Sequence, residues 1–214
     1  MTSMQCGKRV LGLIVSGLWA AGLLGAGSAM AEDYESGFGF QISVPEVWLV
    51  LTRHEVAEKS DTLLSPNGPS ALASIPREMR HSVFERIAAG ELEVFYRQDG
   101  IEDEFIDNVN VMMQPSPLPA NAEQLATICM LLPEEFSKIF GRPIGMEACE
   151  IRDVVDHRAL YLQFDGAIPG TTTLQYQLAR GRNATLVLTA TAPTTNVPRM
   201  MGEFEDMVSS IRRQ

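Results

Sequence analysis

The N-terminal part of the folded region begins with a regular alternation of apolar and polar residues. Every second residue from Phe38 to Val44 is apolar and the residues between are small or polar, which is the period of a strand with one buried face. The pattern predicts a strand over 37–44 that ends at Pro45. The apolar run over 47–52 predicts a second strand directly after it.

Two helices are predicted in the middle of the chain. Apolar residues recur at helical spacing over 76–89, and Pro76 suits the first turn of a helix. The segment 122–140 is also helical in pattern, with Asn121 as its N-cap. Pro133 lies inside that segment and is expected to break or restart the helix, because proline removes one backbone hydrogen bond.

Two strands are predicted between these helices. Residues 91–96 and 108–113 alternate apolar with polar side chains, and Asp99-Gly100 marks a turn between them. We therefore expect the two strands to be neighbours in one sheet.

The C-terminal third carries the clearest strand pattern. Leu174, Tyr176 and Leu178 share one face of a strand while Gln175 and Gln177 share the other, so one face is expected to be buried and the other at least partly wet. Short connections join consecutive strands and predict antiparallel neighbours. The four predicted strands are Met146 to Val154, Ala159 to Phe164, Thr172 to Arg180 and Ala184 to Ala192.

The chain is predicted to end in an amphipathic helix. Its apolar residues form one stripe and are expected to pack on the sheet; they are Val197, Met200, Met201, Phe204, Met207, Val208 and Ile211. Strands joined by hairpins, with helices interspersed, indicate an α+β fold on a mainly antiparallel sheet. Its length and the lack of internal repeats predict a single domain over 32–214.

Residues 1–31 have the order of a secretory signal peptide. Lys8 and Arg9 precede an apolar run, and Ala29 and Ala31 give the small-residue exit that a signal peptidase reads. We expect cleavage between Ala31 and Glu32, which places the mature protein in the periplasm or outside the cell with no integral membrane span. The alternative is an uncleaved anchor, since the uncharged stretch is long enough to reach across a bilayer core of about 30 Å.

The charge of the chain narrows the classes of partner. Lys and Arg total 17 against 27 Asp and Glu, a net charge of −10. An acidic excess of this size argues against binding nucleic acid and against docking on an anionic membrane, because both need clustered Lys and Arg.

Export also changes how the cysteines are interpreted. After the signal the chain holds two, Cys129 and Cys149, in a compartment that favours disulfides. A bond between them would stabilise the fold by roughly 3 kcal/mol. The alternative is a pair of buried free thiols. A two-cysteine metal site is disfavoured because neither residue belongs to a C-x-x-C pair.

Four segments together resemble the PsbP/DcrB-like family. They are Phe40-Gln41-Ile42-Ser43-Val44-Pro45 with Trp48, Asn108-Val109-Asn110-Val111, Leu160-Tyr161-Leu162, and the terminal helix from Phe204 to Ile211. The resemblance covers most of 36–212 and implies an α/β/α sandwich, with a curved antiparallel sheet flanked by helices. It also implies a non-enzymatic accessory, assembly or binding protein. The simple secretory signal departs from the photosystem branch of that family.

No catalytic, cofactor or metal motif is present in the sequence. The G-x-S-x-G, Walker, H-E-x-x-H and EF-hand patterns are all missing. His54, Glu55 and Glu58 would fall within one helical turn and offer metal ligands if that segment is helical. With Lys59 adjacent, a solvated polar face is the favoured interpretation.

Other polar clusters have equally plain interpretations. Asp99, 102–104 and Asp107 form the densest acidic cluster and suggest weak calcium binding, but without the spacing of a calcium loop a charged loop is favoured. His157 follows an aspartate at a strand connection, which is typical of a turn. Methionines in the apolar segments suggest an adaptable partner groove, although core packing explains most of them.

The sequence therefore predicts a periplasmic, non-enzymatic accessory or binding protein without a cofactor. It would dock either an envelope protein or a small ligand. The alternative is an exported enzyme with an unrecognised polar or metal-assisted site, for which His54, Glu58 and His157 are the candidates.

Overall fold

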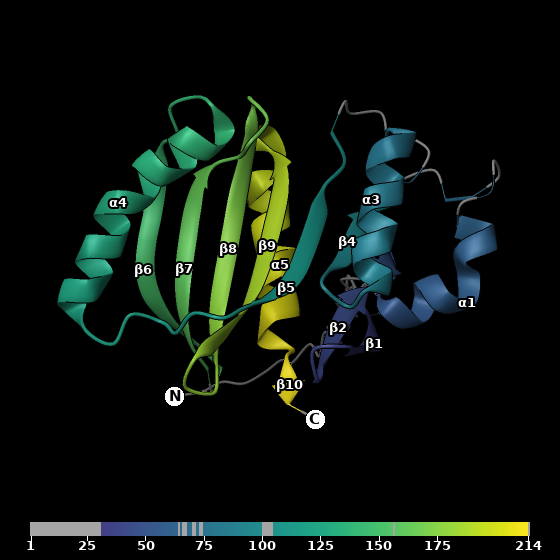
Figure 1. Cartoon of the computed structure of the whole chain (residues 1–214), viewed down its shortest axis with the longest axis horizontal. Coiled ribbons are helices and arrows are strands. Elements are labelled where there is room, and N and C mark those ends of the chain that lie inside the picture. Colours follow the sequence, from purple (N-terminus) through teal and green to yellow (C-terminus); the bar gives the residue numbers. More distant parts are fainter. Residues whose placement is uncertain are drawn as a thin grey trace, which may run out of the picture.

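The centre of the molecule is a seven-stranded antiparallel sheet, in the order β3-β4-β5-β9-β8-β7-β6 (Figure 1). The computed structural model describes residues 31–213 except 64, 66, 67, 70, 71, 73, 74, 100–104 and 156. The strands are β3 (Trp48–Leu51), β4 (Glu93–Arg97), β5 (Asn108–Gln114), β6 (Met146–Val154), β7 (His157–Asp165), β8 (Thr171–Arg180) and β9 (Ala184–Pro193). The predicted pairing of β4 with β5 is confirmed, as are the antiparallel hairpins of the C-terminal third.

A second, three-stranded sheet has the order β1-β2-β10, from β1 (Ala31–Ser36), β2 (Phe40–Pro45) and β10 (Arg212–Arg213). The strand predicted at 37–44 is thus a hairpin turn followed by β2, and Gly39 supplies the positive φ of 76° that this turn requires.

Most of the predicted signal peptide lies outside the described residues. Ala31, its last residue, is the first residue of β1.

The helices lie on both faces of the large sheet. They are α1 (Arg53–Leu63), α3 (Arg77–Ala88), α4 (Ala122–Phe140) and α5 (Val197–Ser209), and a short 3-10 turn, Thr194–Asn196, precedes α5. In Figure 1 α5 runs behind β8 and β9, whereas α4 and α3 lie in front of opposite sides of the sheet. This arrangement is the predicted α/β/α sandwich. No helix of the described residues has the length and hydropathy of a membrane span.

The period of two along each strand divides the core between the two faces. On the face under α5, Phe95, Tyr161 and Tyr176 join one large cluster with Phe204. On the opposite face there are two separate clusters: α1 and α3 cover the β3 and β4 side, and α4 covers β6 and β7. The apolar stripe predicted for the last helix is confirmed, since its central residues are buried in the large cluster.

The prediction for Pro133 is wrong, because α4 continues through it without a break. Proline removes only its own N–H from the helix. Residues before and after Pro133 make contacts that keep α4 continuous. Leu132 and Phe136 pack against the sheet, and the Ser137 hydroxyl donates to the Pro133 carbonyl at 2.6 Å. The predicted N-cap is confirmed: Asn121 Oδ1 accepts from the backbone N–H of Gln124 at 2.9 Å.

Candidate functional site

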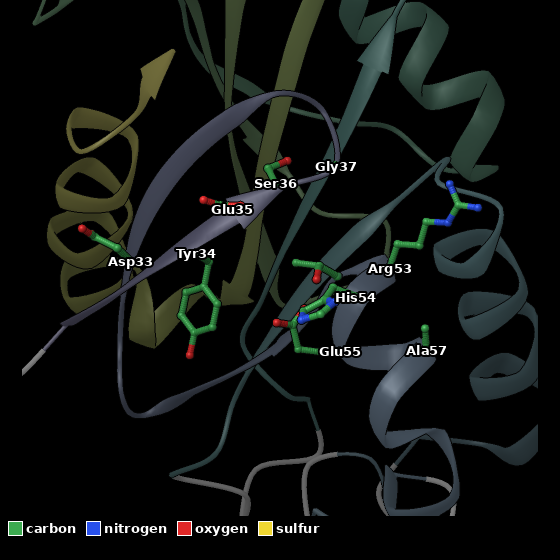
Figure 2. A pocket seen from close by; sticks show the side chains of 10 residues that line it. Asp33, Tyr34, Glu35, Ser36, Gly37, Arg53, His54, Glu55 and Ala57 are labelled. Atoms are coloured by element: carbon green, nitrogen blue, oxygen red, sulfur yellow. The ribbon is translucent and has the colours of Figure 1, made fainter. Parts of the chain in front are cut away.

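A cavity of about 820 Å³ lies where β1 passes the first turns of α1 (Figure 2). Both elements are polar and neither was predicted firmly from the sequence. Three carboxylates and two basic side chains lie around the cavity, which we call the β1–α1 pocket. It is lined by Asp33, Tyr34, Glu35, Ser36, Gly37, Thr52, Arg53, His54, Glu55 and Ala57.

The alternation of β1 places its residues on the two faces of the small sheet. Asp33 and Glu35 are exposed, whereas Tyr34 packs partly against the large core cluster and Ser36 is buried. In Figure 2 the Arg53 side chain extends away from Tyr34, and its guanidinium lies beside Gly90 at the end of α3. Of the three lining carboxylates, Glu55 is the one whose charge acts on Tyr34.

Two inward polar groups in this pocket lack a hydrogen-bond partner. Thr52 and Glu55 have the T-x-x-E spacing of a capping box at the start of α1, but neither reciprocal bond is made. Among the described residues, Thr52 Oγ1 and Glu55 Oε2 are buried and unpaired. The Thr52 side chain belongs to a residue only 3% exposed. Buried polar groups are normally satisfied, so these two oxygens are exceptions.

A buried carboxylate lies directly beneath the pocket. Glu93 on β4 is 3% exposed and accepts hydrogen bonds of 2.7 Å from the Ser36 hydroxyl and the Gly37 backbone N–H. Burial raises the pKa of Glu93; those two hydrogen bonds oppose the rise, and the charge of Glu55 adds to it. Glu93 thus anchors the β1–β2 turn to the large sheet.

Tyr34 acts in this pocket as a neutral phenol. Burial raises the pKa of Tyr34 to about 12, helped by the hydrogen bond of 2.9 Å that it donates to Glu32 and by the charges of Glu32, Glu55 and Glu46. It therefore keeps its proton at neutral pH and serves as a donor, not as a base.

The residues proposed for an enzymatic or metal site are not brought together. His54 and Glu58 face each other along α1 at 3.5 Å, with 71% and 57% of their side chains exposed. His157 starts β7, which is five strand spacings from β3, roughly 24 Å. No group of three potential metal ligands occurs among the described residues. The exposure of His54 and Glu58 agrees with the solvated polar face that the sequence favoured.

Of the acidic residues singled out in the sequence, the structure describes Asp99 and Asp107, and both form ion pairs. Asp99 pairs with Arg97, and Asp107 is buried and pairs with Arg199 at 2.6 Å. Residues 102–104 lie outside the described residues. The suggested methionine groove is also not formed, because the methionines are divided among the three core clusters and Met130 is exposed on α4.

The two cysteines lie on α4 and β6. In the structure the Sγ atoms of Cys129 and Cys149 are bonded, with their Cα atoms 5.7 Å apart, within the usual range for a disulfide. That the bond forms in the cell stays a prediction.

Replacing Glu93 with glutamine is expected to stabilise the protein at neutral pH by on the order of 1 kcal/mol. The raised pKa of Glu93 means that the folded state holds this proton more tightly than the unfolded state does. The stability that protonated Glu93 contributes is therefore fully present below the ordinary carboxyl pKa of 4.5. It is lost as the pH rises through the raised pKa of the folded state. An amide keeps the shape and carries no charge.

Urea unfolding of wild type and Glu93→Gln, at neutral pH and below pH 4.5, measures this effect. The two proteins should differ at neutral pH and converge in acid. Glu91→Gln is the matched control, because that carboxylate is largely exposed and its loss should change little at either pH. A destabilised Glu93→Gln protein at neutral pH would show that the charged form is the favoured one.

Comparison with known proteins finds a similar fold but no matching sequence family. No protein-family model matches the sequence, and no curated protein matches it. The solution structure of cyanobacterial PsbP (CyanoP) from Synechocystis sp. PCC 6803 is similar, with a TM-score of 0.51 and 12% identity over 89% of this chain and 96% of that one. The chain thus has a PsbP-like fold, as the sequence resemblance predicted.

Two further structures are similar at lower TM-scores. LpqN, involved in cell envelope biogenesis of Mycobacterium tuberculosis, has 12% identity over 85% of this chain and 89% of that one, with a TM-score of 0.48. The Saccharomyces cerevisiae Ran-binding protein Mog1p has 10% identity over 87% and 96%, with a TM-score of 0.47. Identities of 10–12% show at most a similar fold. The function is therefore argued from the pocket.

Proposed function

We propose that this chain is a periplasmic, non-enzymatic binding protein that docks a protein partner in the β1–α1 pocket. The observation that carries the proposal is the pair of buried, unpaired oxygens at Thr52 and Glu55. A buried acceptor without a donor is costly, and a partner that supplies N–H groups would remove that cost.

The charge of the pocket defines the group that fits. Asp33, Glu35 and Glu55 line it, with Asp33 and Glu35 at the exposed rim and Glu55 near enough to Tyr34 to act on its charge. A carboxylate accepts hydrogen bonds but does not donate them. A Lys ammonium or an Arg guanidinium donates several hydrogen bonds and neutralises acidic charge. The proposed occupant is therefore a basic side chain.

The free edge of β1 supports a protein partner over a small amine. β1 is the outer strand of the order β1-β2-β10, so among the described residues its second edge has no strand beside it. An extended segment can add to such an edge by backbone hydrogen bonds and place every second side chain toward one face. A basic residue on that segment would then enter the pocket beside β1.

Site-directed photocrosslinking in the native envelope tests the proposal. A photoreactive amino acid replaces Asp33 at the pocket rim; the matched control replaces Arg182, exposed in the turn between β8 and β9. We expect one protein adduct from position 33 and none from 182. Glu55→Gln should reduce the yield at least about tenfold, because a hydrogen bond to a charged group contributes about 1.5–3 kcal/mol.

Mass spectrometry of the adduct locates the contact. A crosslinked peptide with a Lys or Arg next to the modified residue supports the assignment. Equal capture from both positions, or capture that Glu55→Gln leaves unchanged, rules out this pocket as the docking site.

A further inference from the structure

Among the described residues, helices cover the face of the large sheet opposite α5 only at its two sides. Helix α4 covers β6 and β7, and α1 and α3 cover β3 and β4. Figure 1 shows the middle strands β5, β9 and β8 without a helix in front of them. Some of the side chains that these strands turn to this face line a cavity beside α4, which we call the central channel.

The floor of the central channel is polar and uncharged. It consists of hydroxyl and carboxamide side chains at alternate positions: Asn108, Thr173, Gln175, Thr189 and Thr191. Gln175 donates to the Thr189 hydroxyl at 2.9 Å and accepts from Gln177 at 2.8 Å. The hydroxyls of Thr173 and Thr191 are 3.3 Å apart. These bonds orient the side chains and leave a second amide N–H and further hydroxyl lone pairs for a ligand.

One end of the central channel is closed by aromatic side chains. Phe136 of α4 stacks on Phe164 with ring centroids 4.5 Å apart and on Phe140 at 6.0 Å. Ile168 stands at the rim and is 54% exposed. Together with the polar floor they enclose a cavity of about 320 Å³, at the small end of the usual range for ligand sites.

We propose that the central channel binds a neutral saccharide. A sugar ring presents hydroxyl groups that both donate and accept, which match hydroxyls and carboxamides, and it presents C–H groups that match a phenylalanine wall. None of the described residues that line the cavity is charged, although the whole chain carries −10. A charged ligand would find no counter-charge among the described lining residues, and a purely apolar ligand would leave the second amide N–H of Gln175 without a partner.

This site is separate from the β1–α1 pocket and shares no lining residue with it. It takes a different chemical class of ligand. The saccharide proposal and the partner proposal therefore fail or succeed independently.

Titration of the isotope-labelled mature protein with maltose and with N,N′-diacetylchitobiose, followed by NMR, tests the proposal. We expect shift changes in the side-chain amide signals of Asn108 and Gln175. Gln175→Leu should weaken the binding at least about tenfold, because it removes the central hydrogen-bonding group of the floor. Gln41→Leu on β2 of the other sheet is the matched control and should bind as wild type does.

Two probes separate the saccharide from other occupants. Glucose 6-phosphate should bind more weakly than the neutral sugars, because the described residues of the channel offer no cation to its phosphate. Oleate should not shift the amide signals of the floor. Shifts caused by oleate and not by sugars, no shifts with either sugar, or equal sugar binding by Gln175→Leu and wild type would overturn the proposal.

Discussion

Replacing Phe204 with alanine is expected to lower the free energy of unfolding by about 3–5 kcal/mol, the usual cost of removing a large core side chain. Phe204 is fully buried, and its ring lies 5.6 Å from that of Tyr176 on β8. It stands in the middle of the stripe by which α5 packs on the sheet. Alanine would leave a cavity that neighbouring strands cannot close, because the sheet backbone is fixed by its ladders.

Urea denaturation followed by far-UV circular dichroism measures this loss. Asp206→Ala is the matched control, since that residue is exposed on the same helix and should change stability by no more than about 0.5 kcal/mol. A loss below about 1 kcal/mol for Phe204→Ala would contradict the packing of α5 described above, because it would mean that the ring is not enclosed.

The sequence predicted the elements whose residues alternate between a buried and a wet face. Leu174, Tyr176 and Leu178 are buried under α5, while Gln175 and Gln177 stay half-exposed, as the period of two required. Such strands can be predicted because burial of one face requires an apolar residue at every second position. The last helix could be predicted for the same reason, with apolar residues at a period of 3.6.

The β1–α1 pocket was not predicted because its elements carry little burial signal. β1 is acidic and mostly exposed, so nothing in its composition distinguishes it from a loop. The start of α1 did carry a signal, the T-x-x-E spacing of Thr52 and Glu55. Their unpaired state depends on tertiary placement, however, which local spacing does not determine.

The central channel shows a second limit of sequence reasoning. The wet face of β8 was predicted, but its neighbours were not known to be polar on the same face. Thr189 and Asn108 come from strands far apart in the chain and are joined to β8 only through the order β5-β9-β8. A site made by strand order becomes visible only when that order is known.

Removing the bond between Cys129 and Cys149 is expected to cost about 3 kcal/mol, the entropy of closing a loop of this length in the unfolded chain. The double variant Cys129→Ala/Cys149→Ala should unfold at lower urea than the oxidised wild type. Reductant should lower the midpoint of wild type and leave that of the variant unchanged, which makes the variant its own control. Alkylation and mass spectrometry of the protein isolated from cells without reductant establish whether the thiols are protected; free thiols there would contradict the prediction.

The loss should be concentrated at α4. None of the nineteen residues of α4, all of which the structure describes, is fully buried, so its packing rests on half-buried side chains such as Leu132, Phe136 and Phe140. The disulfide ties the middle of this helix to β6, and Phe136 and Phe140 form the wall of the central channel. Amide hydrogen exchange should therefore rise first in α4 when the bond is removed. Uniform acceleration across the large sheet would show instead that α4 and the sheet unfold as one unit.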